Sequence, residues 1–207
     1  MFEKIILNLR HPKGFLGSLI LSMMNMGHSP LIKSVLKQES FSNSDIVLDI
    51  GCGGGMAVDY MSDFVNKVYG VDYSKAAVEK AAKKNFTKIK NGKVRIIQAN
   101  VDELPFEPES FNYITAFETI YFWENLPKNL ADIYKLLKPE GKLIIALEAY
   151  KENGAIKNYS SVLDCLNLKL YEAEELVGLL KKAGFESTFI TRGKKMASWL
   201  CVSGVKT

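Results

Sequence analysis

The feature that most constrains the fold of this sequence is a glycine loop directly after a short apolar run. Residues 46–50 are rich in β-branched side chains, and four of the next five positions are glycines. A helix-like segment over residues 56–64 follows the loop. A strand that turns sharply into a helix opens a β-α-β unit, and its turn lies at the carboxyl end of the strand. The loop therefore predicts an open α/β sheet with a ligand site at this turn.

The same alternation of strands and helices continues along the chain. Further strand-like runs cover residues 67–71, 94–98, 112–117 and 142–147, and helix-like segments cover residues 75–85 and 128–137. An amphipathic helix over residues 172–183 then precedes two β-rich runs, 187–191 and 196–202, whose short separation predicts a hairpin. We expect a Rossmann-like, doubly wound α/β fold, with helices on both faces of a seven-stranded sheet. The sheet is predicted to be mostly parallel, with an antiparallel last strand.

The chain is predicted to form a single domain over its 207 residues, because no repeat, low-complexity segment or Pro/Gly/Ser-rich linker divides it. Residues 1–44 are expected to form an N-terminal helical cap segment, with a helix that begins near Ser29 and Pro30. Residues 45–150 form the predicted cofactor-binding core. Residues 151–207 supply a substrate-side insert, the last helix and the hairpin.

Composition argues against several classes of protein. Hydrophobic residues make up 47% of the chain, but no window reaches the roughly 18 consecutive apolar residues of a membrane span. The longest apolar stretch, Phe15–Met26, lacks a signal-peptide cleavage site. Three cysteines without a CxxC pair and only two histidines provide little for a zinc site. We therefore expect a cytoplasmic protein without a membrane span or a metal.

The glycine loop carries an acid, Asp49, at the place where many nucleotide-binding proteins hold a phosphate. A carboxylate beside a pyrophosphate adds like-charge repulsion, and Met56 occupies the third glycine position of the dinucleotide pattern. A dinucleotide is thus disfavoured. A ligand that carries both an ammonium and a carboxylate group matches Asp49 together with the N-terminus of the next helix. An amino-acid moiety has both groups.

A second acid, Asp72, ends the next strand. It lies about 20 residues after the loop, where a carboxylate accepts hydrogen bonds from ribose hydroxyls. The alternative for Asp72 is an ordinary acid at the start of a helix, just before Ser74. Combined with Asp49, Asp72 predicts a ligand with an amino acid at one end and a nucleoside at the other. S-adenosylmethionine is such a ligand.

Four stretches across residues 46–147 resemble the class I S-adenosylmethionine-dependent methyltransferases. LDIGCGGG resembles the first motif of that family, and VYGVDYS resembles its ribose-binding strand end. IIQANVDELPFEPESFNYI is similar to the third-strand region, and YKLLKPEGKLII is similar to the turn into the fifth strand. The segment ANVDELPF resembles the methyltransferases of quinone biosynthesis and their small-molecule relatives. The resemblance implies methyl transfer to a small-molecule acceptor by in-line displacement.

The resemblance also implies a set of cofactor-binding residues. Those of the loop are Asp49, Gly51, Cys52, Gly53 and Gly55, and those beyond it are Asp72, Tyr73, Asn100, Val101 and Phe117. Asp72 is implied to hold the ribose, Tyr73 to lie along the adenine, and Asn100 with Val101 to recognise its edge. Many family members have Asp in place of Asn100, and Asp102 is an alternative to it. Phe117 has an alternative as an ordinary core residue.

The acceptor pocket is expected from three segments rich in aromatic and methionine side chains. They contain Met23, Met24, Met26 and His28, then Tyr121, Phe122 and Trp123, then Tyr150 and Tyr159. Among these, His28, Tyr121, Trp123 and Tyr150 are the predicted substrate contacts, and core packing is the alternative. A general base is needed only if the acceptor must lose a proton. The candidates for it are His28, Glu118 and Tyr121.

Two other functions remain open with the same fold. Basic residues at both ends of the chain motivate an RNA methyltransferase, and a binding protein that keeps the cofactor without catalysis is the second alternative. The fourth strand ends in AFETIYFW, without the Asn/Asp-Pro-Pro-aromatic motif that holds a planar amino group, and no cysteine follows a proline. These absences favour a small-molecule acceptor over nucleic acid.

Overall fold

The computed structural model describes residues 28–152, 155–157, 169–193 and 199–207. The chain divides into two compact units, with the boundary between Leu104 and Pro105. Met23, Met24, Met26 and Tyr159, which were expected near the acceptor, lie outside the described residues. Within the described parts of the chain, no helix is both long and apolar enough to cross a membrane.

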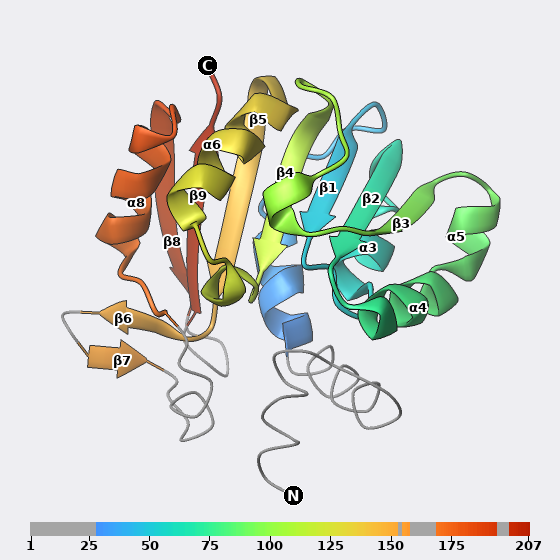
Figure 1. Cartoon of the computed structure of the whole chain (residues 1–207), viewed down its shortest axis with the longest axis horizontal. Helices are drawn as coiled ribbons and strands as arrows, with labels where there is room; N and C mark the ends of the chain where they lie inside the picture. The colour runs from blue at the N-terminus through green and yellow to red at the C-terminus, as the bar shows by residue number, and fades with distance from the viewer. Residues whose placement is uncertain (1–27, 153–154, 158–168, 194–198) are drawn as a thin grey trace, which may run out of the picture. The chain divides into compact units, whose positions relative to one another are not determined.

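The first unit is built from three parallel strands and the helices that connect them (Figure 1). After a helix over residues 28–36 come β1 (Ile46–Ile50), α3 (Met56–Met61), β2 (Lys67–Asp72), α4 (Lys75–Lys84), α5 (Phe86–Lys90), β3 (Val94–Gln98) and the 3-10 helix η1 (Val101–Glu103). β2 pairs in parallel with β1 and with β3, so the carboxyl ends of the three strands lie at one edge. α3 and α4 contact each other and β2, and therefore cover the same face of this unit.

Local signals account for the helix boundaries in this unit. Ser74 caps α4, because its hydroxyl accepts a hydrogen bond from the Ala77 N–H. α3 ends at Met61, three residues before the predicted end at Phe64, and residues 62–64 form turns. α5, a single short turn of helix after Asn85, was not predicted. Four of the five residues of β1 are buried, as in a parallel strand that is covered on both faces.

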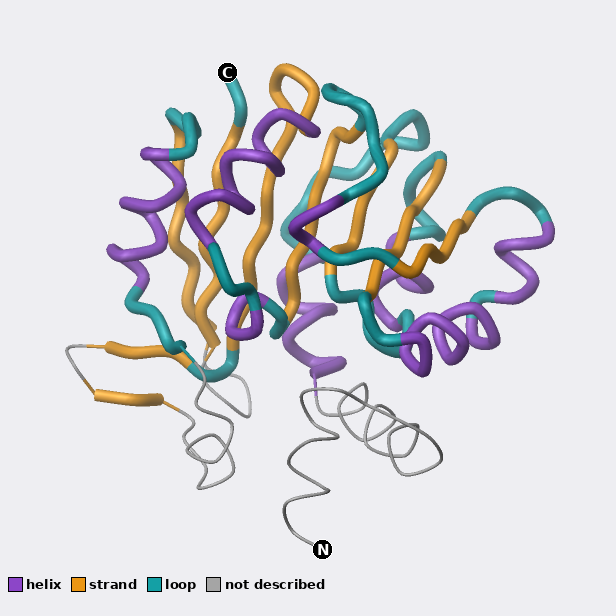
Figure 2. The backbone as a smooth tube through the Cα atoms, in the orientation of Figure 1, coloured by secondary structure: helices purple, strands orange, loops and turns teal. Residues whose placement is uncertain are grey.

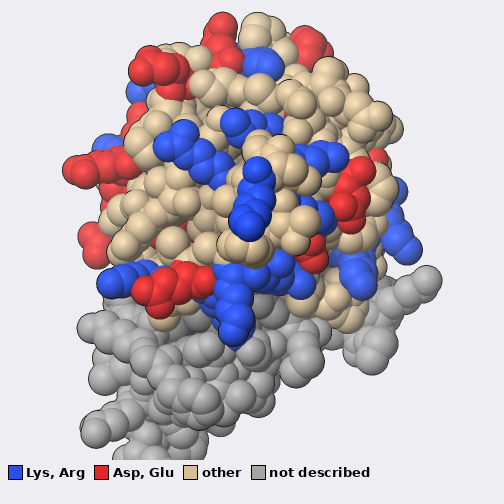
Figure 3. Space-filling model, turned by 90° about the vertical axis from the view of Figure 1, so that its right-hand side faces the viewer, with Lys and Arg blue, Asp and Glu red and all other residues tan. Residues whose placement is uncertain are grey.

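Lysine side chains are frequent along α4 and α5. They are Lys75, Lys80, Lys83, Lys84, Lys88 and Lys90, and the two helices contain one acid, Glu79. Figure 3 views the molecule from this side and shows Lys and Arg side chains spread over it.

The second unit contains the remaining strands. It comprises β4 (Phe111–Phe117), the 3-10 helix η2 (Ile120–Phe122), α6 (Leu126–Leu136), β5 (Leu137–Leu147), β6 (Tyr150–Glu152), β7 (Ala155–Lys157), α8 (Ala173–Lys182), β8 (Ser187–Gly193) and β9 (Trp199–Val205). β4 and β5 pair in parallel, whereas β9 is antiparallel to both β5 and β8. α6 contacts β5, α8 contacts β8 and β9, and the two helices contact each other, so they cover one face of this unit.

The strands form a seven-stranded sheet in the order β3-β2-β1-β4-β5-β9-β8. The predicted mostly parallel α/β sheet with an antiparallel last strand is confirmed. β5 starts at Leu137, five residues earlier than predicted, because its first residue pairs with Phe111 across a register shift in β4. β6 and β7 were not predicted; they form a separate two-stranded ribbon after β5 (Figure 2).

Candidate functional site

The glycine loop between β1 and α3 contains three glycines in the left-handed region. Gly51, Gly53 and Gly55 have φ values of 71°, 51° and 77°, which side chains with a Cβ rarely adopt. The N–H groups of Gly51 and Cys52 donate to the carbonyl of Val71, at 2.8 and 3.0 Å. The loop is therefore folded back against the carboxyl end of β2.

Asp72 holds the loop at a second point. Its Oδ2 accepts a hydrogen bond from the Gly53 N–H and its Oδ1 accepts one from the Ser74 N–H, both at 2.9 Å. Burial raises the pKa of this carboxyl, and the two backbone hydrogen bonds act in the opposite direction. A carboxylate oxygen that accepts one N–H retains a second acceptor position. Asp72 thus fixes the loop and still offers acceptor positions that suit a pair of hydroxyl groups.

Asp49 lies in β1 at the start of the loop and is 2% exposed. Burial, followed by the negative charges of Asp72 and Asp49, raises the pKa of the Cys52 thiol well above its usual range. Two carboxyl groups and a neutral thiol therefore meet at the base of the loop. Charge interactions are strong in such a buried setting, so the loop favours a cationic ligand group over a phosphate.

The predicted adenine-side residues follow the carboxyl ends of β2 and β3. Tyr73 is 40% exposed, and its carbonyl accepts a hydrogen bond from the Gln98 side chain at 3.0 Å. The Oδ1 of Asn100 accepts from the Asp102 N–H at 3.3 Å and caps η1, which begins at Val101. The partly exposed ring of Tyr73 offers a face on which a planar base can stack.

Glu118, in the second unit, is held at the carboxyl end of β4 in an unusual backbone conformation. Its φ of 54° is in the left-handed region, which costs a non-glycine residue about 1–3 kcal/mol. The carboxylate accepts hydrogen bonds from the Glu148 N–H and from the Tyr121 hydroxyl, the latter at 3.3 Å. Burial, and then the charge of Glu118, raises the pKa of Tyr121 well above its usual range. At neutral pH Tyr121 is therefore protonated and donates to Glu118.

Three predicted aromatic residues lie in the second unit and are almost fully buried. Phe117 ends β4, Trp123 follows η2, and Tyr150 begins β6; their exposed fractions are 8%, 8% and 3%. These three aromatic side chains are therefore buried. His28 begins the helix over residues 28–36 in the first unit and is partly exposed.

The structure adds Asn85, a residue that the sequence analysis missed. It lies between α4 and α5, is 1% exposed, and donates from its side chain to the carbonyl of Gly55 at 3.1 Å. An asparagine at the end of a helix is common for local reasons alone, so the sequence carries no sign of this contact.

The first unit also has a hollow of about 530 Å³ between residues 36–43 and residues 60–64. None of the predicted cofactor or acceptor residues lines it, so we do not assign the functional site to this hollow.

Comparisons with known proteins agree with this geometry. Residues 48–145 match the methyltransferase domain family. The chain is 31% identical over 157 residues to the uncharacterized methyltransferase YodH of Bacillus subtilis, covering 75% of this chain and 66% of that protein. It is 28% identical over 131 residues to the mitochondrial ubiquinone biosynthesis O-methyltransferase of Schizosaccharomyces pombe, covering 63% of this chain and 47% of that protein. The chain thus spans between about half and two thirds of the length of these two relatives.

The fold is also similar to that of a solved methyltransferase. Phosphoethanolamine N-methyltransferase 2 of Haemonchus contortus, in complex with phosphomonomethylethanolamine and S-adenosylhomocysteine, superposes with a TM-score of 0.74 at 21% identity. The match covers 87% of this chain and 53% of that one. The sheet order and the glycine loop define a methyltransferase-type α/β fold. With the sequence matches, the chain belongs to the class I S-adenosylmethionine-dependent methyltransferase family.

Proposed function

We propose that this protein transfers a methyl group from S-adenosylmethionine to a small-molecule acceptor. The observation that carries the proposal is the buried Asp49 at the start of the glycine loop, together with the hydrogen bond by which Asp72 holds this loop at Gly53. Negative charge at this loop suits an ammonium group, and the acceptor positions of Asp72 suit ribose hydroxyls. Membership of the methyltransferase family supports the same ligand.

The described residues fit the parts of this cofactor. In the proposal, Asp49 binds the ammonium group and the loop Gly51–Gly55 surrounds the methionine part. Asp72 accepts hydrogen bonds from the ribose, and Tyr73 stacks on the adenine. Asn100 accepts from the adenine amino group, and Val101 donates its N–H to the ring. When bound, the cofactor supplies a methyl group already activated by a sulfonium charge.

The second unit supplies the acceptor side in this proposal. Of the residues predicted from the sequence, Phe117 is assigned to the cofactor, and Trp123 and Tyr150 are assigned to apolar contacts with the acceptor. Of Glu118 and Tyr121, Glu118 is the better candidate to accept a proton, because Tyr121 is already protonated and donates to the Glu118 carboxylate. The S. pombe relative, an O-methyltransferase of ubiquinone biosynthesis, supports a small-molecule acceptor for this chain too.

Isothermal titration calorimetry tests the cofactor. We expect wild-type protein to bind S-adenosylmethionine and S-adenosylhomocysteine but not NAD. Asp49→Asn keeps the shape of the side chain and removes its charge, so affinity should fall about tenfold, the equivalent of one charged hydrogen bond. Asp132→Asn removes a charge from α6, where Asp132 pairs with Lys128 and Lys135, and should leave affinity unchanged. Binding of NAD alone would end the proposal.

A transfer assay tests the acceptor. The protein is incubated with methyl-labelled S-adenosylmethionine and a cell extract separated into small molecules and RNA. We expect label in the small-molecule fraction. Label confined to RNA would instead support the RNA methyltransferase, and cofactor binding without transfer to any fraction would support a catalytically silent protein.

A further inference from the structure

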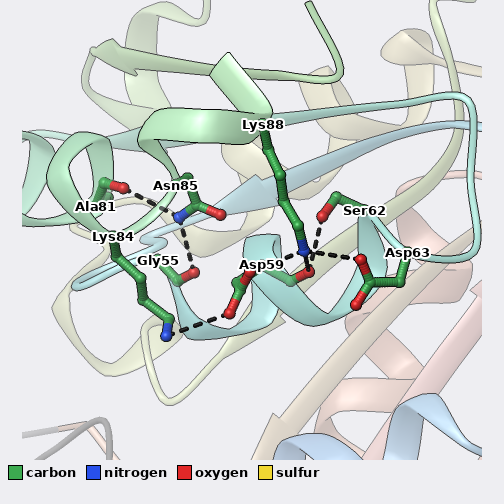
Figure 4. A network of polar contacts seen from close by, with 8 residues as sticks. All are labelled: Gly55, Asp59, Ser62, Asp63, Ala81, Lys84, Asn85 and Lys88. Atoms are coloured by element: carbon green, nitrogen blue, oxygen red, sulfur yellow. Dashed lines mark hydrogen bonds and ion pairs between the residues drawn. The ribbon is translucent and has the colours of Figure 1, made fainter. Parts of the chain in front are cut away.

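α3, the helix after the glycine loop, is too short to hold its own position. It has six residues, and its N-cap, Gly55, has no side chain to cap it. Helices of this length are not stable alone, so neighbouring elements must hold α3 in place. Figure 4 shows that residues from the end of α4 to α5 contact it at both ends.

Asn85 contacts the back of the glycine loop. Its Nδ2 donates to the carbonyl of Gly55 at 3.1 Å and to that of Ala81 at 3.0 Å. Because both partners are carbonyl oxygens, the amide must turn its NH₂ group toward them. The Oδ1 of Asn85 is buried, with no hydrogen-bond partner among the described residues. A buried oxygen without a hydrogen-bond partner is destabilising. The favourable interactions of this side chain therefore come from its donor group.

The glycine loop and α4 are in close contact at Gly55. A Cβ at this glycine would lie 2.6 Å from the Nδ2 of Asn85 and 2.9 Å from the Cβ of Ala81, closer than side chains approach one another. Asn85 therefore sits directly behind the loop, without an intervening layer. A change in the position or charge of this amide acts on the loop backbone itself.

Two lysines hold the far end of α3 (Figure 4). The Nζ of Lys88 lies 2.8 Å from a carboxylate oxygen of Asp59 and of Asp63, and 2.7 Å from the carbonyl of Asp59. The Nζ of Lys84 lies 3.2 Å from the other carboxylate oxygen of Asp59. Partial burial opposes the charge of Lys88, but the hydrogen bonds to Asp59 and Asp63 raise its pKa. These two lysines connect α3 to the end of α4 and to α5.

We propose that Asn85 is a positioning residue, which sets the glycine loop for the amino-acid end of the methyl donor, and that Lys88 supports it by fixing α3. The proposal rests on the function proposed above, because it assigns the methionine part of the ligand to this loop. The nucleoside end is assigned to Asp72 and Tyr73, whereas the side chain of Asn85 donates to the carbonyls of Gly55 and Ala81. Disturbing Asn85 must then weaken binding of the amino-acid end selectively.

Two ligands separate these ends of the site. S-adenosylhomocysteine carries the amino-acid group, whereas 5′-methylthioadenosine has the same nucleoside and sulfur without it. Asn85→Asp keeps the shape but replaces the donor with an oxygen that faces two carbonyls. We expect calorimetry to show about a tenfold loss of affinity for S-adenosylhomocysteine, and about a twofold loss or less for 5′-methylthioadenosine. Equal losses for both ligands would mean that Asn85 is merely structural, and would overturn the proposal.

Asn129 provides a control. It is a second fully buried asparagine, and it lies in α6 in the other unit. We expect Asn129→Ala to lower the unfolding temperature while the ratio of the two affinities stays at the wild-type value. A change in that ratio as large as the one in Asn85→Asp would contradict a specific role for Asn85.

Lys88 keeps the proposal testable if the Asn85 variants do not fold. Lys88→Met removes the contacts with Asp59 and Asp63 and should weaken S-adenosylhomocysteine binding about threefold, whereas Lys88→Arg keeps the charge and should restore it. An unchanged affinity in folded Lys88→Met would refute the supporting role. If wild-type protein does not bind S-adenosylhomocysteine, the proposed function fails; if it binds but Asn85→Asp keeps wild-type selectivity, only this inference fails.

Discussion

Asp72 shows how a single side chain can serve the local structure and a ligand together. Its two carboxylate oxygens already accept backbone hydrogen bonds from Gly53 and Ser74. These contacts orient the carboxylate and connect the end of β2 to the glycine loop 19 positions earlier. The remaining acceptor positions are then preorganised, because the side chain has little rotational freedom left to lose on binding.

Cofactor affinity is expected to fall as the pH is lowered through the raised pKa of Asp72, because a protonated carboxyl loses acceptor capacity. The stability effect has the opposite sign. The folded pKa lies above the unfolded one, so between these values the folded state binds more protons, and this group's contribution to the free energy of unfolding decreases as the pH rises.

Calorimetry with S-adenosylhomocysteine and urea unfolding, both across the mildly acidic range, measure these two effects. Asp72→Asn lacks the titrating group. It should therefore show neither this fall in affinity at low pH nor this change in stability. If wild type and Asp72→Asn had the same pH profile, Asp72 would not be the group responsible.

At the scale of elements, two glycines in the second unit have opposite surroundings. Gly178 lies inside α8, and a Cβ there would meet nothing within 4 Å. Gly204 lies in β9, and a Cβ there would come within 2.8 Å of the Phe185 ring. The first glycine therefore weakens its helix without a packing reason, whereas the second allows β9 to approach Phe185 closely.

These surroundings predict opposite effects of the same substitution. Gly178→Ala should raise the free energy of unfolding by about 0.5–1 kcal/mol, because alanine loses less backbone entropy in a helix. Gly204→Ala should lower it by about 1–3 kcal/mol, because the added methyl group overpacks the contact with Phe185. Urea denaturation of the two variants provides the measurement. A destabilised Gly178→Ala or a neutral Gly204→Ala would show that the packing described is wrong.

The element boundaries illustrate what local patterns predict well and badly. Ser74 marks the start of α4 in both sequence and structure, because a cap depends on residues within one turn. The start of β5 at Leu137 was missed, because its first residues are held by pairing with Phe111 of β4 and by hydrogen bonds with Lys206, just after β9. Glu140 adopts a φ of 62° within this strand, and its N–H donates to the carbonyl of Lys206. Contacts between distant segments thus overrode the local turn signals.

At the scale of the whole molecule, the predicted residues divide between the two units. Those assigned to the methionine part, ribose and adenine all belong to the first unit, and Phe117, Glu118 and Tyr121 belong to the second. The prediction of a single domain stays a prediction. We expect the cofactor to act on the stability of the folded chain, because it is assigned to groups that unfolding would separate.

A ligand that binds only the folded state stabilises it by mass action. At a concentration of about 100 times its Kd, S-adenosylhomocysteine should raise the free energy of unfolding by about 2.7 kcal/mol. Thermal unfolding followed by circular dichroism, at fixed protein concentration, should therefore show a higher Tm with this ligand and an unchanged Tm with NAD. The reverse pattern would argue for a dinucleotide site.

The sequence by itself determined the α/β class, the glycine loop and the acids Asp49 and Asp72, because these depend on strand and helix periods and on short spacings. Tertiary structure alone decided that Asn85 donates to the carbonyl of Gly55 and that Glu118 accepts from the N–H of Glu148. Each of these hydrogen bonds joins residues 30 positions apart. No local pattern encodes such pairs. Whether two distant polar groups meet depends on how the intervening elements pack, since packing determines which buried donors and acceptors come within reach of each other.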